Sequence, residues 1–382
     1  MYRTLLHISQ KLSVAMALLL MVLIPVSCSD KLDGTQEYGC CNVGLRLTLD
    51  EISSTKAPSG SYDDGRSTPY ENYINVAEQD FKVLLFEPSA PYRLASEIQN
   101  IKINAVEADR LTSKTYLLLG DVPATMKSGS YKVVFLANWK GCGGHYPAVT
   151  PGITTIDDIA NGSSFNYAAD FSLGPGRGIP MYGVKDCGNL KFEKDMLTDF
   201  GRMHLLRAMA KVEVRPSETG LPIKSATLTR SYSSGLAAPL KIYRQEDYVR
   251  GSYINDYLDS IHLPDTPSVI ESLPFTQKDD GSFVIYMPEY DNTSVAAIPS
   301  QIHLVFDASD SFDEIYYEAD IDFKYYSMQA ALDAGKNLGD KFDVKRNHCY
   351  IYTVTKKIDP GIRIVVDVIP YSSVELDPEF GL

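Results

Sequence analysis

The chain has 382 residues and is acidic, with 49 Asp and Glu against 36 Lys and Arg and a formal charge of -13. A surface of that sign repels phosphate backbones, which argues against a nucleic-acid partner. The 25 Tyr, the single Trp and the many Val, Ile and Thr favour pleated sheet over helix, and the length allows two domains.

The first 27 residues predict a secretory signal peptide. Arg3 and Lys11 give a basic start, 14–24 is an unbroken apolar run, and small residues precede Cys28. The run is shorter than the roughly 20 residues that span a bilayer. A Cys in this place resembles a lipobox, although Pro25 stands where Leu is usual. We expect cleavage before Cys28 and acylation of its thiol, for example with palmitate; an ordinary signal peptide with an incidental Cys is the alternative.

A polar, acidic stretch follows, and we expect residues 28–42 to form a tether. An acidic patch directly after a lipidated Cys resembles the surface-export signal of Bacteroidota lipoproteins. A solvated linker accounts for the same composition.

The first half then has the pattern of short strands. Val43, Leu45, Leu47 and Leu49 alternate with smaller or polar residues, which predicts a strand with one apolar face. The Ser-, Gly-, Pro- and Asp-rich stretch Ser53–Tyr70 contains Lys56 and Arg66 and is expected to be exposed and mobile. Further strands are expected at Phe81–Phe86, Ile98–Ile103, Thr115–Leu119 and Tyr131–Ala137.

The middle of the chain, Lys140–Gly183, is rich in Gly and Pro turns, with one short helix expected from Thr155. A long Tyr- and Pro-rich excursion, Ser231–Thr276, interrupts the second half and is expected to be functional or mobile. Strands of that half are expected at Ala210–Arg215, Ala226–Arg230, Phe283–Met287, Gln301–Phe306, Glu314–Phe323, Cys349–Thr355 and Ile362–Ile369. This succession of short strands, turns and long loops predicts an all-β chain. We expect two tandem Greek-key β-sandwich domains with long loops, 43–198 and 199–382.

The sequence contains no HExxH, no GxSxG, no phosphate loop and no dinucleotide fingerprint. The six His are scattered, and Asp307–Asp310 lacks the Gly and Glu of a calcium loop. We therefore expect no enzyme, no metal and no cofactor. Five Cys remain after Cys28, an odd number; most are expected to be structural thiols, and Cys142 with Cys187, both in Gly-flanked loops, is the best candidate disulfide.

Four stretches together resemble the fimbrillin-like family, the fimbrial subunit and anchor lipoproteins of Bacteroidales. They are IPMYG at Ile179–Gly183, LRAMAKVEV at Leu206–Val214, KRNHCYIYTVT at Lys345–Thr355 and VELDPEFGL at Val374–Leu382. Their order behind a lipobox and a strand-rich first half spans nearly the whole mature chain. Within them, Arg346, Asn347 and His348 are expected to fix a turn rather than to do chemistry.

The resemblance implies two transthyretin-like sandwiches and export as a lipoprotein of the cell outer membrane. In such proteins an Arg- or Lys-specific protease removes the first strand of a shaft subunit, and a neighbour's strand fills the vacated groove. Anchor relatives keep the lipidated N-terminus. The implied partners are other fimbrial subunits, the outer membrane, and host or bacterial surface ligands bound during adhesion.

The chain offers two apolar strands for such donor-strand exchange. One carries Val43, Leu45, Leu47 and Leu49, and the other carries Ile362, Ile364, Val366 and Val368. Alternatively, both are resident strands of their own domains. Arg66 is the preferred cleavage site, because Arg46 lies inside the first strand; an anchor would not be cut at all.

Two functions compete after this reading. The favoured one is a structural protein of the fimbrium, or pilus, as base, shaft or tip. The alternative is a surface glycan-binding lipoprotein, in which Tyr residues of Ser231–Tyr257 stack on sugars. A hydrolase is a third interpretation that no motif supports.

Overall fold

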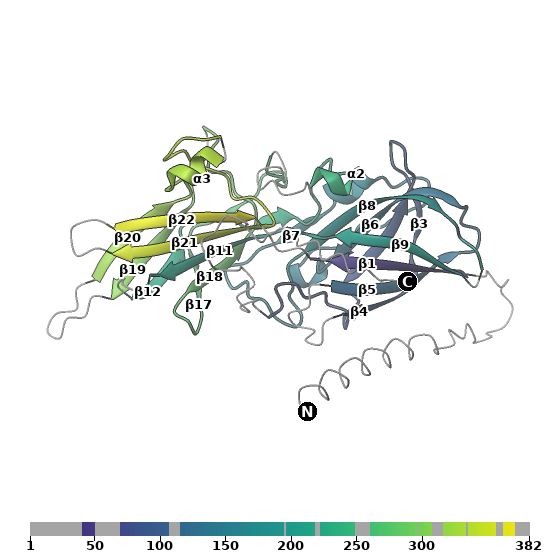
Figure 1. The fold of residues 1–382 in the computed structure, drawn as a ribbon, viewed down its shortest axis with the longest axis horizontal. Coiled ribbons are helices and arrows are strands. Elements are labelled where there is room, and N and C mark those ends of the chain that lie inside the picture. Colours follow the sequence, from purple (N-terminus) through teal and green to yellow (C-terminus); the bar gives the residue numbers. More distant parts are fainter. Residues whose placement is uncertain are drawn as a thin grey trace, which may run out of the picture. The chain divides into compact units, whose positions relative to one another are not determined.

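The computed structural model describes residues 40–49, 69–106, 115–194, 196–217, 222–248, 260–295, 297–307, 316–333, 335–356 and 362–370. The regular structure is almost entirely β-strand, and the expected all-β sandwich fold is confirmed (Figure 1). The signal peptide, Cys28, Arg66 and Val374–Leu382 lie outside the described residues. Within the described ranges, no helix is long and apolar enough to cross a membrane.

Residues 40–207 form two sheets that we call the first sandwich. One sheet has the strand order β4-β5-β1-β9 and the other β10-β8-β6-β2-β3. The strands are β1 (Cys40–Thr48), β2 (Phe81–Phe86), β3 (Leu94–Glu97), β4 (Gln99–Ala105), β5 (Thr115–Pro123), β6 (Gly129–Ala137), β8 (Met181–Leu190), β9 (Leu197–His204) and β10 (Leu206–Arg207). Alternate side chains of both sheets, such as Leu45, Leu118 and Val133, share one buried cluster between them.

Residues 210–370 form two further sheets that we call the second sandwich. Their strand orders are β17-β18-β11-β21-β22 and β16-β12-β19-β20. The strands are β11 (Ala210–Pro216), β12 (Ile223–Leu228), β16 (Leu273–Pro274), β17 (Thr276–Gln277), β18 (Phe283–Met287), β19 (Gln301–Asp307), β20 (Tyr316–Asp322), β21 (His348–Lys356) and β22 (Ile362–Pro370). Val212, Leu304 and Tyr352 belong to its core, and the same buried cluster continues to Leu84 and Phe86 of β2.

Short elements connect these sheets. Two small ladders pair β7 (Ser164–Asn166) with β14 (Ser234–Leu236) and β13 (Ser231–Tyr232) with β15 (Val269–Ile270); the helical turns are η1 (Lys140–Cys142), α2 (Ile156–Asn161), η2 (Gln245–Asp247) and α3 (Met328–Asp333). The helix expected from Thr155 is confirmed as α2. The Thr155 side chain accepts a hydrogen bond from the Asp158 amide, and the Asp158 carboxylate accepts one from the Thr155 amide, so the helix starts with a complete capping box.

The opening strands of the two sandwiches have the same surroundings. β1 lies between β5, which is antiparallel to it, and β9, which is parallel. β11 likewise lies between antiparallel β18 and parallel β21. In both sandwiches, therefore, the first strand is an interior strand whose parallel neighbour comes from much later in the chain.

The expected domain boundary lies between residues 198 and 199. It falls inside β9, whose residues Leu197–His204 pair with β1. The chain leaves the first sandwich only after β10, which pairs with β8, and β11 starts at Ala210. The sequence pattern missed this because parallel pairing has no local signature. The division into independent domains stays a prediction.

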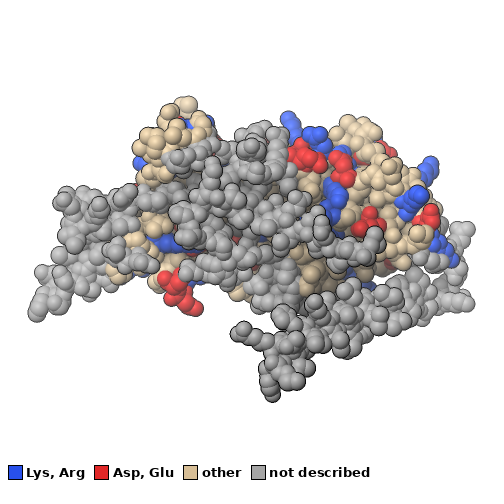
Figure 2. All heavy atoms as spheres, viewed as in Figure 1, with Lys and Arg blue, Asp and Glu red and all other residues tan. Residues whose placement is uncertain are grey.

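Charges on the described surface are mixed. In the view of Figure 2, Lys and Arg side chains alternate with Asp and Glu side chains over the first sandwich. Several form ion pairs, such as Lys82 with Glu97 at 2.9 Å and Lys132 with Asp186 at 2.5 Å. Lys132 is itself buried, whereas a partly exposed pair such as Lys82 with Glu97 contributes little to stability, so burial in the two cores is the main source of stability.

Candidate functional site

β1 is the centre of the candidate functional site, because it is fully enclosed and comes first in the described chain. Nine of its residues pair with β5, and its other edge pairs with β9. The expected apolar face is confirmed: Val43, Leu45, Leu47 and Leu49 are each at most 2% exposed. The main chain of β1 is thus hydrogen-bonded on both sides, and its side chains complete the core of the first sandwich.

Removing β1 would leave a groove with unpaired strand edges and an exposed apolar floor, which favours binding of another strand. The facing edges of β5 and β9 would lose their ladder partners, and such open edges recruit strands. Burying one Val and three Leu contributes about 1.5–3 kcal/mol per side chain, or roughly 6–12 kcal/mol as an upper estimate. A strand that supplies apolar side chains with the same period of two would recover both contributions.

Of the two candidate cleavage sites, only Arg46 lies in the described part of the chain. Its main chain pairs with Leu117 of β5 and with Arg202 of β9. A protease needs its substrate as an extended, unpaired chain, so Arg46 is protected while β1 is in place. Arg66 belongs to the stretch between β1 and Pro69 that the structure does not describe.

The second candidate strand is an edge strand. Residues Ile362–Pro370 form β22, which pairs antiparallel with β21 over nine residues and is the last strand of its sheet. Ile362, Ile364, Val366 and Val368 lie opposite Lys356, Val354, Tyr352 and Tyr350. In the single chain β22 is therefore resident in the second sandwich, and among the described residues no strand of that sheet pairs with its other edge.

Three of the four family-like stretches fall within the described residues, namely Ile179–Gly183, Leu206–Val214 and Lys345–Thr355. Ile179–Gly183 leads into β8, where the Tyr182 hydroxyl donates to the Ile242 carbonyl at 2.9 Å. A Cβ on Gly183 would lie 2.6 Å from Met203 Sδ, 2.7 Å from Leu205 Cδ2 and 3.1 Å from the His204 carbonyl oxygen, so these neighbours would have to shift. Leu206–Val214 forms β10 and β11.

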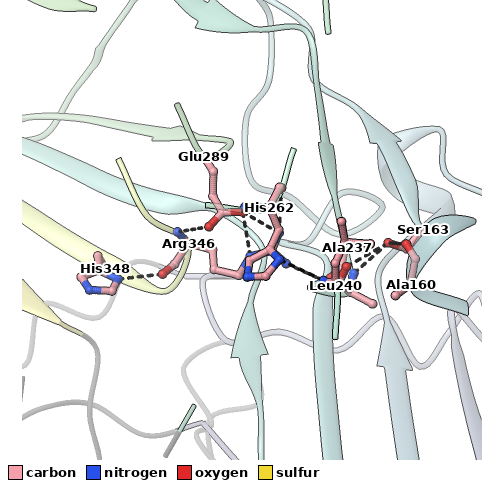
Figure 3. A network of polar contacts seen from close by, with 9 residues as sticks. Ala160, Ser163, Ala237, Leu240, His262, Glu289, Arg346 and His348 are labelled. Carbon is pink, nitrogen blue, oxygen red and sulfur yellow. Dashed lines mark hydrogen bonds and ion pairs between the residues drawn. The ribbon is translucent and has the colours of Figure 1, made fainter. Parts of the chain in front are cut away.

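Arg346, Asn347 and His348 fix a turn, as expected. Asn347 has a left-handed backbone with φ 55°, and its amide donates to Met209 O at 3.0 Å. Arg346 forms a buried ion pair with Glu289, with Nη2–Oε2 at 2.6 Å and Nε–Oε2 at 3.0 Å (Figure 3). Both guanidinium contacts converge on Glu289 Oε2, while Oε1 accepts from the Arg346 backbone amide at 3.3 Å, and these charge-assisted hydrogen bonds stabilise the buried pair.

Two neutral histidines complete this network (Figure 3). His262 Nδ1 accepts from the Leu240 amide at 3.1 Å, and the His262 amide donates to Glu289 Oε2 at 3.0 Å. His348 Nδ1 lies 2.7 Å from Arg346 O. Burial lowers the pKa of both imidazoles to about 4, and the Arg346 guanidinium adds to the effect at His262. The sequence pattern had no signal for Glu289 or His262, because their partners are distant in the chain.

The Tyr-rich excursion joins the sandwiches. We call its described residues, 231–248 and 260–274, the strap. On the first sandwich, the Tyr248 hydroxyl donates to His204 O at 2.7 Å, and Lys132 Nζ donates to Tyr243 O at 3.0 Å. On the second, Arg346 Nη1 and Nη2 reach the carbonyls of Ala237 and His262 at 3.4 and 3.3 Å.

The strap does not present the flat exposed Tyr platform that sugar stacking requires, as far as its described residues go. Tyr248 is 1% exposed. Tyr232 stacks on Tyr290 with ring centroids 4.5 Å apart, and Tyr243 packs on Tyr92 at 4.9 Å. Tyr248 is buried and the rings of Tyr232 and Tyr243 are partly buried against the protein, which weakens the glycan-binding alternative as far as the described residues go.

The candidate disulfide between Cys142 and Cys187 is wrong, because both thiols are free and belong to different cores. Cys142 lies in η1 and donates to Gly178 O at 3.4 Å, whereas Cys187 lies in β8 and donates to Phe200 O at 3.6 Å. Burial raises the pKa of Cys142 to about 12 and that of Cys187 to about 11, so both thiols stay protonated. They behave as small apolar core residues.

No protein-family model and no curated protein sequence matches the chain. Solved structures do. The tip fimbrial protein Mfa3 from Porphyromonas gingivalis, in a C-terminally truncated form, superposes with a TM-score of 0.50 at 13% identity over 86% of this chain and 100% of that one.

Two further structures are similar at lower scores. A fimbrial assembly protein from Parabacteroides distasonis has a TM-score of 0.43 at 11% identity, over 86% of this chain and 96% of its own. The fimbrial anchor protein Mfa2 from Porphyromonas gingivalis has 0.32 at 12% identity, over 87% and 100%. At these identities the likeness concerns the fold, and 86% of this chain has the fold of the truncated tip fimbrial protein Mfa3.

Proposed function

We propose that this chain is a structural protein of surface fimbriae, joined to its neighbours by exchange of its first strand. The observation that carries the proposal is the position of β1: an interior strand, paired on both sides, whose four apolar side chains are at most 2% exposed. A strand so deeply embedded and yet terminal in the described chain can be removed by one cut and replaced by a strand of the same period. The fold shared with a tip fimbrial protein supports it.

Proteolytic cleavage after β1 decides whether the chain acts as a polymerising subunit or as an anchor. Lys56 and Arg66 follow β1 in sequence, and cleavage at Arg66 would detach β1 together with everything before it. The cut subunit can accept a strand in the β5–β9 groove. An uncut chain keeps β1 and any lipid on Cys28, and it would end the fibre at the outer membrane as an anchor. The role is mechanical and adhesive rather than enzymatic, with other fimbrial subunits as the main partners.

A gel of cell-surface material, run unheated and heated in denaturing detergent, tests the assembly. Strand exchange buries a whole strand, so multimers should survive detergent and separate only on heating. The double variant Leu45→Asp with Leu47→Asp is the comparison protein in which β1 cannot pack into the first sandwich. Burying a carboxylate without a partner there costs too much free energy. A single monomer band from the wild-type protein under both conditions would sink the proposal.

Lipid anchoring is tested separately. We expect radiolabelled palmitate to be incorporated by the wild-type protein and lost in Cys28→Ala, with the variant released from the membrane fraction. Unchanged labelling of Cys28→Ala would place the lipid elsewhere. This result would leave the strand-exchange test unaffected, since that test reads the groove and not the tether.

A further inference from the structure

Five polar side chains meet where the chain passes from β10 to β11, and we call Glu71, Asn72, Arg207, Lys211 and Asn347 the junction clasp. Arg207 Nη2 donates to Asn72 Oδ1, while its Nη1 and its amide donate to Asn347 Oδ1 at 3.2 and 3.1 Å. Lys211 Nζ lies 3.2 Å from Glu71 Oε2. The clasp therefore ties residues 71–72, just before β2, to the crossover and to the turn before β21.

Most of the clasp is buried, so water does not readily replace a hydrogen-bond partner that is lost there. Arg207 is 0%, Asn72 1% and Glu71 5% exposed. Burial lowers the pKa of Lys211, but Glu71 and other neighbouring groups more than offset this, so its pKa lies well above the ordinary value and the ammonium stays charged. Lys211 Nζ also lies 3.9 Å from Glu213 Oε2, so Glu71 is the nearer of its two carboxylates. Losing a buried charge-assisted contact of this kind is more costly than losing an exposed ion pair.

The segment that carries Glu71 and Asn72 is held on the first sandwich as well. The Tyr116 hydroxyl of β5 donates to Asn72 O at 2.8 Å. The Asn75 amide donates to Asn138 Oδ1 at 2.9 Å, and Asn138 Nδ2 donates in turn to Tyr73 O at 2.7 Å. Residues 71–75 are thus fixed to both sandwiches by bonds that are separate from the β1 ladder, which runs to β5 and β9.

We propose that the junction clasp keeps residues 69–75 in place after β1 has been removed, so that the groove opens while the two sandwiches stay joined. This inference rests on the proposed function, which supplies the cut. Cleavage at Arg66 leaves only Ser67 and Thr68 ahead of Pro69. The new N-terminus then begins next to the clasp, too short and too firmly held to refill the groove in place of a neighbour's strand.

Native-state hydrogen exchange on the full-length protein tests the proposal, with a site-specific protease sequence placed so that cleavage follows Arg66. The amides of Tyr73 and Asn75, bonded to Tyr70 O and to Asn138 Oδ1, report on the clasped segment. After the cut, amides of β5 and β9 should exchange at least a hundredfold faster through release of β1. Tyr73 and Asn75 should change less than threefold. Acceleration of Tyr73 and Asn75 in step with β5 and β9 would overturn the proposal.

A matched pair of variants isolates the clasp. Glu71→Gln should accelerate exchange at Tyr73 and Asn75 at least tenfold, whereas Glu97→Gln, which removes the carboxylate of the half-exposed Lys82 pair, should leave them unchanged. Equal effects of the two variants would contradict the clasp. If Glu71→Gln does not fold, the cut wild-type protein still decides the question. Failure of the cut protein to form heat-sensitive multimers would instead count against the proposed function.

Discussion

Leu47→Ala is the most direct perturbation of β1. Leu47 is 0% exposed and lies between Tyr116 of β5 and Met203 of β9 in the ladder. Truncating a buried Leu costs about 2–5 kcal/mol, since the lost apolar contacts are joined by a cavity. Strands on both sides and a packed sheet opposite limit collapse of that cavity, so we expect about 3 kcal/mol. This is roughly a hundredfold in an equilibrium constant.

Two measurements follow from that magnitude. In the intact protein, urea unfolding should show the full loss of free energy of unfolding. In protein cut between β1 and Pro69, the freed β1 peptide should dissociate about a hundredfold more readily, as measured by size-exclusion chromatography with mass spectrometry. The control is Arg46→Ala, one residue away on the opposite face of the strand, half-buried, with an expected loss below about 1 kcal/mol. Equal losses for Leu47→Ala and Arg46→Ala would refute the enclosed position of β1.

Three further outcomes are expected. The free energy of unfolding should fall as the pH drops from 6.5 to 4. His262 and His348 have pKa values near 4 in the folded protein but gain a proton near pH 6.5 when it is unfolded. The expected loss is about 3 kcal/mol for the buried His348 and less for His262. Glu289→Gln should lower the free energy of unfolding by about 3–5 kcal/mol, since it leaves Arg346 buried without a carboxylate. Gly183→Ala should cost about 1–3 kcal/mol by overpacking, measured by thermal unfolding.

Each outcome has a matched control. His348→Gln should lose most of the drop between pH 6.5 and 4, and an unaltered drop would contradict the assignment. Glu271→Gln removes a 70% exposed carboxylate from an ion pair with Arg230 and should change stability by less than about 0.5 kcal/mol. Gly188→Ala lies in the same strand as Gly183 but meets no atom within 4 Å, so it should be neutral. A Gly183→Ala variant as stable as Gly188→Ala would contradict the close approach.

Much of the fold could be predicted from local sequence patterns. The alternation at Val43–Leu49 placed β1 and its buried face, and Phe81–Phe86 and Phe283–Met287 match β2 and β18 residue for residue. Thr155 gave the start of α2, because a capping box is written within four residues. Such features depend on neighbours in sequence and can be read without knowing the fold.

Features that depend on distant partners were missed. The region of β8 was expected to be loop, because Gly183, Asp186 and Gly188 interrupt the alternation of apolar residues. It forms a strand because it pairs antiparallel with β6. β9 was divided by the expected boundary, since its partner β1 lies about 150 residues earlier. The Tyr-rich excursion was expected to be mobile or functional, yet Tyr232, Tyr243 and Tyr248 of its described part pack on the sandwiches. Nothing in the spacing of Glu289 and Arg346, or of Glu71 and Lys211, announces a buried pair.

The fate of β1 in the assembled fibre is the central claim, and one measurement addresses it. Heat-sensitive multimers are isolated from the cell surface, separated into single chains by heating, and the first residue of each chain is determined by mass spectrometry. We expect the chains from multimers to start after Thr48 and to lack the whole of β1, while monomeric chains still contain Cys40–Thr48. Multimers in which every chain retains Cys40–Thr48 would contradict it.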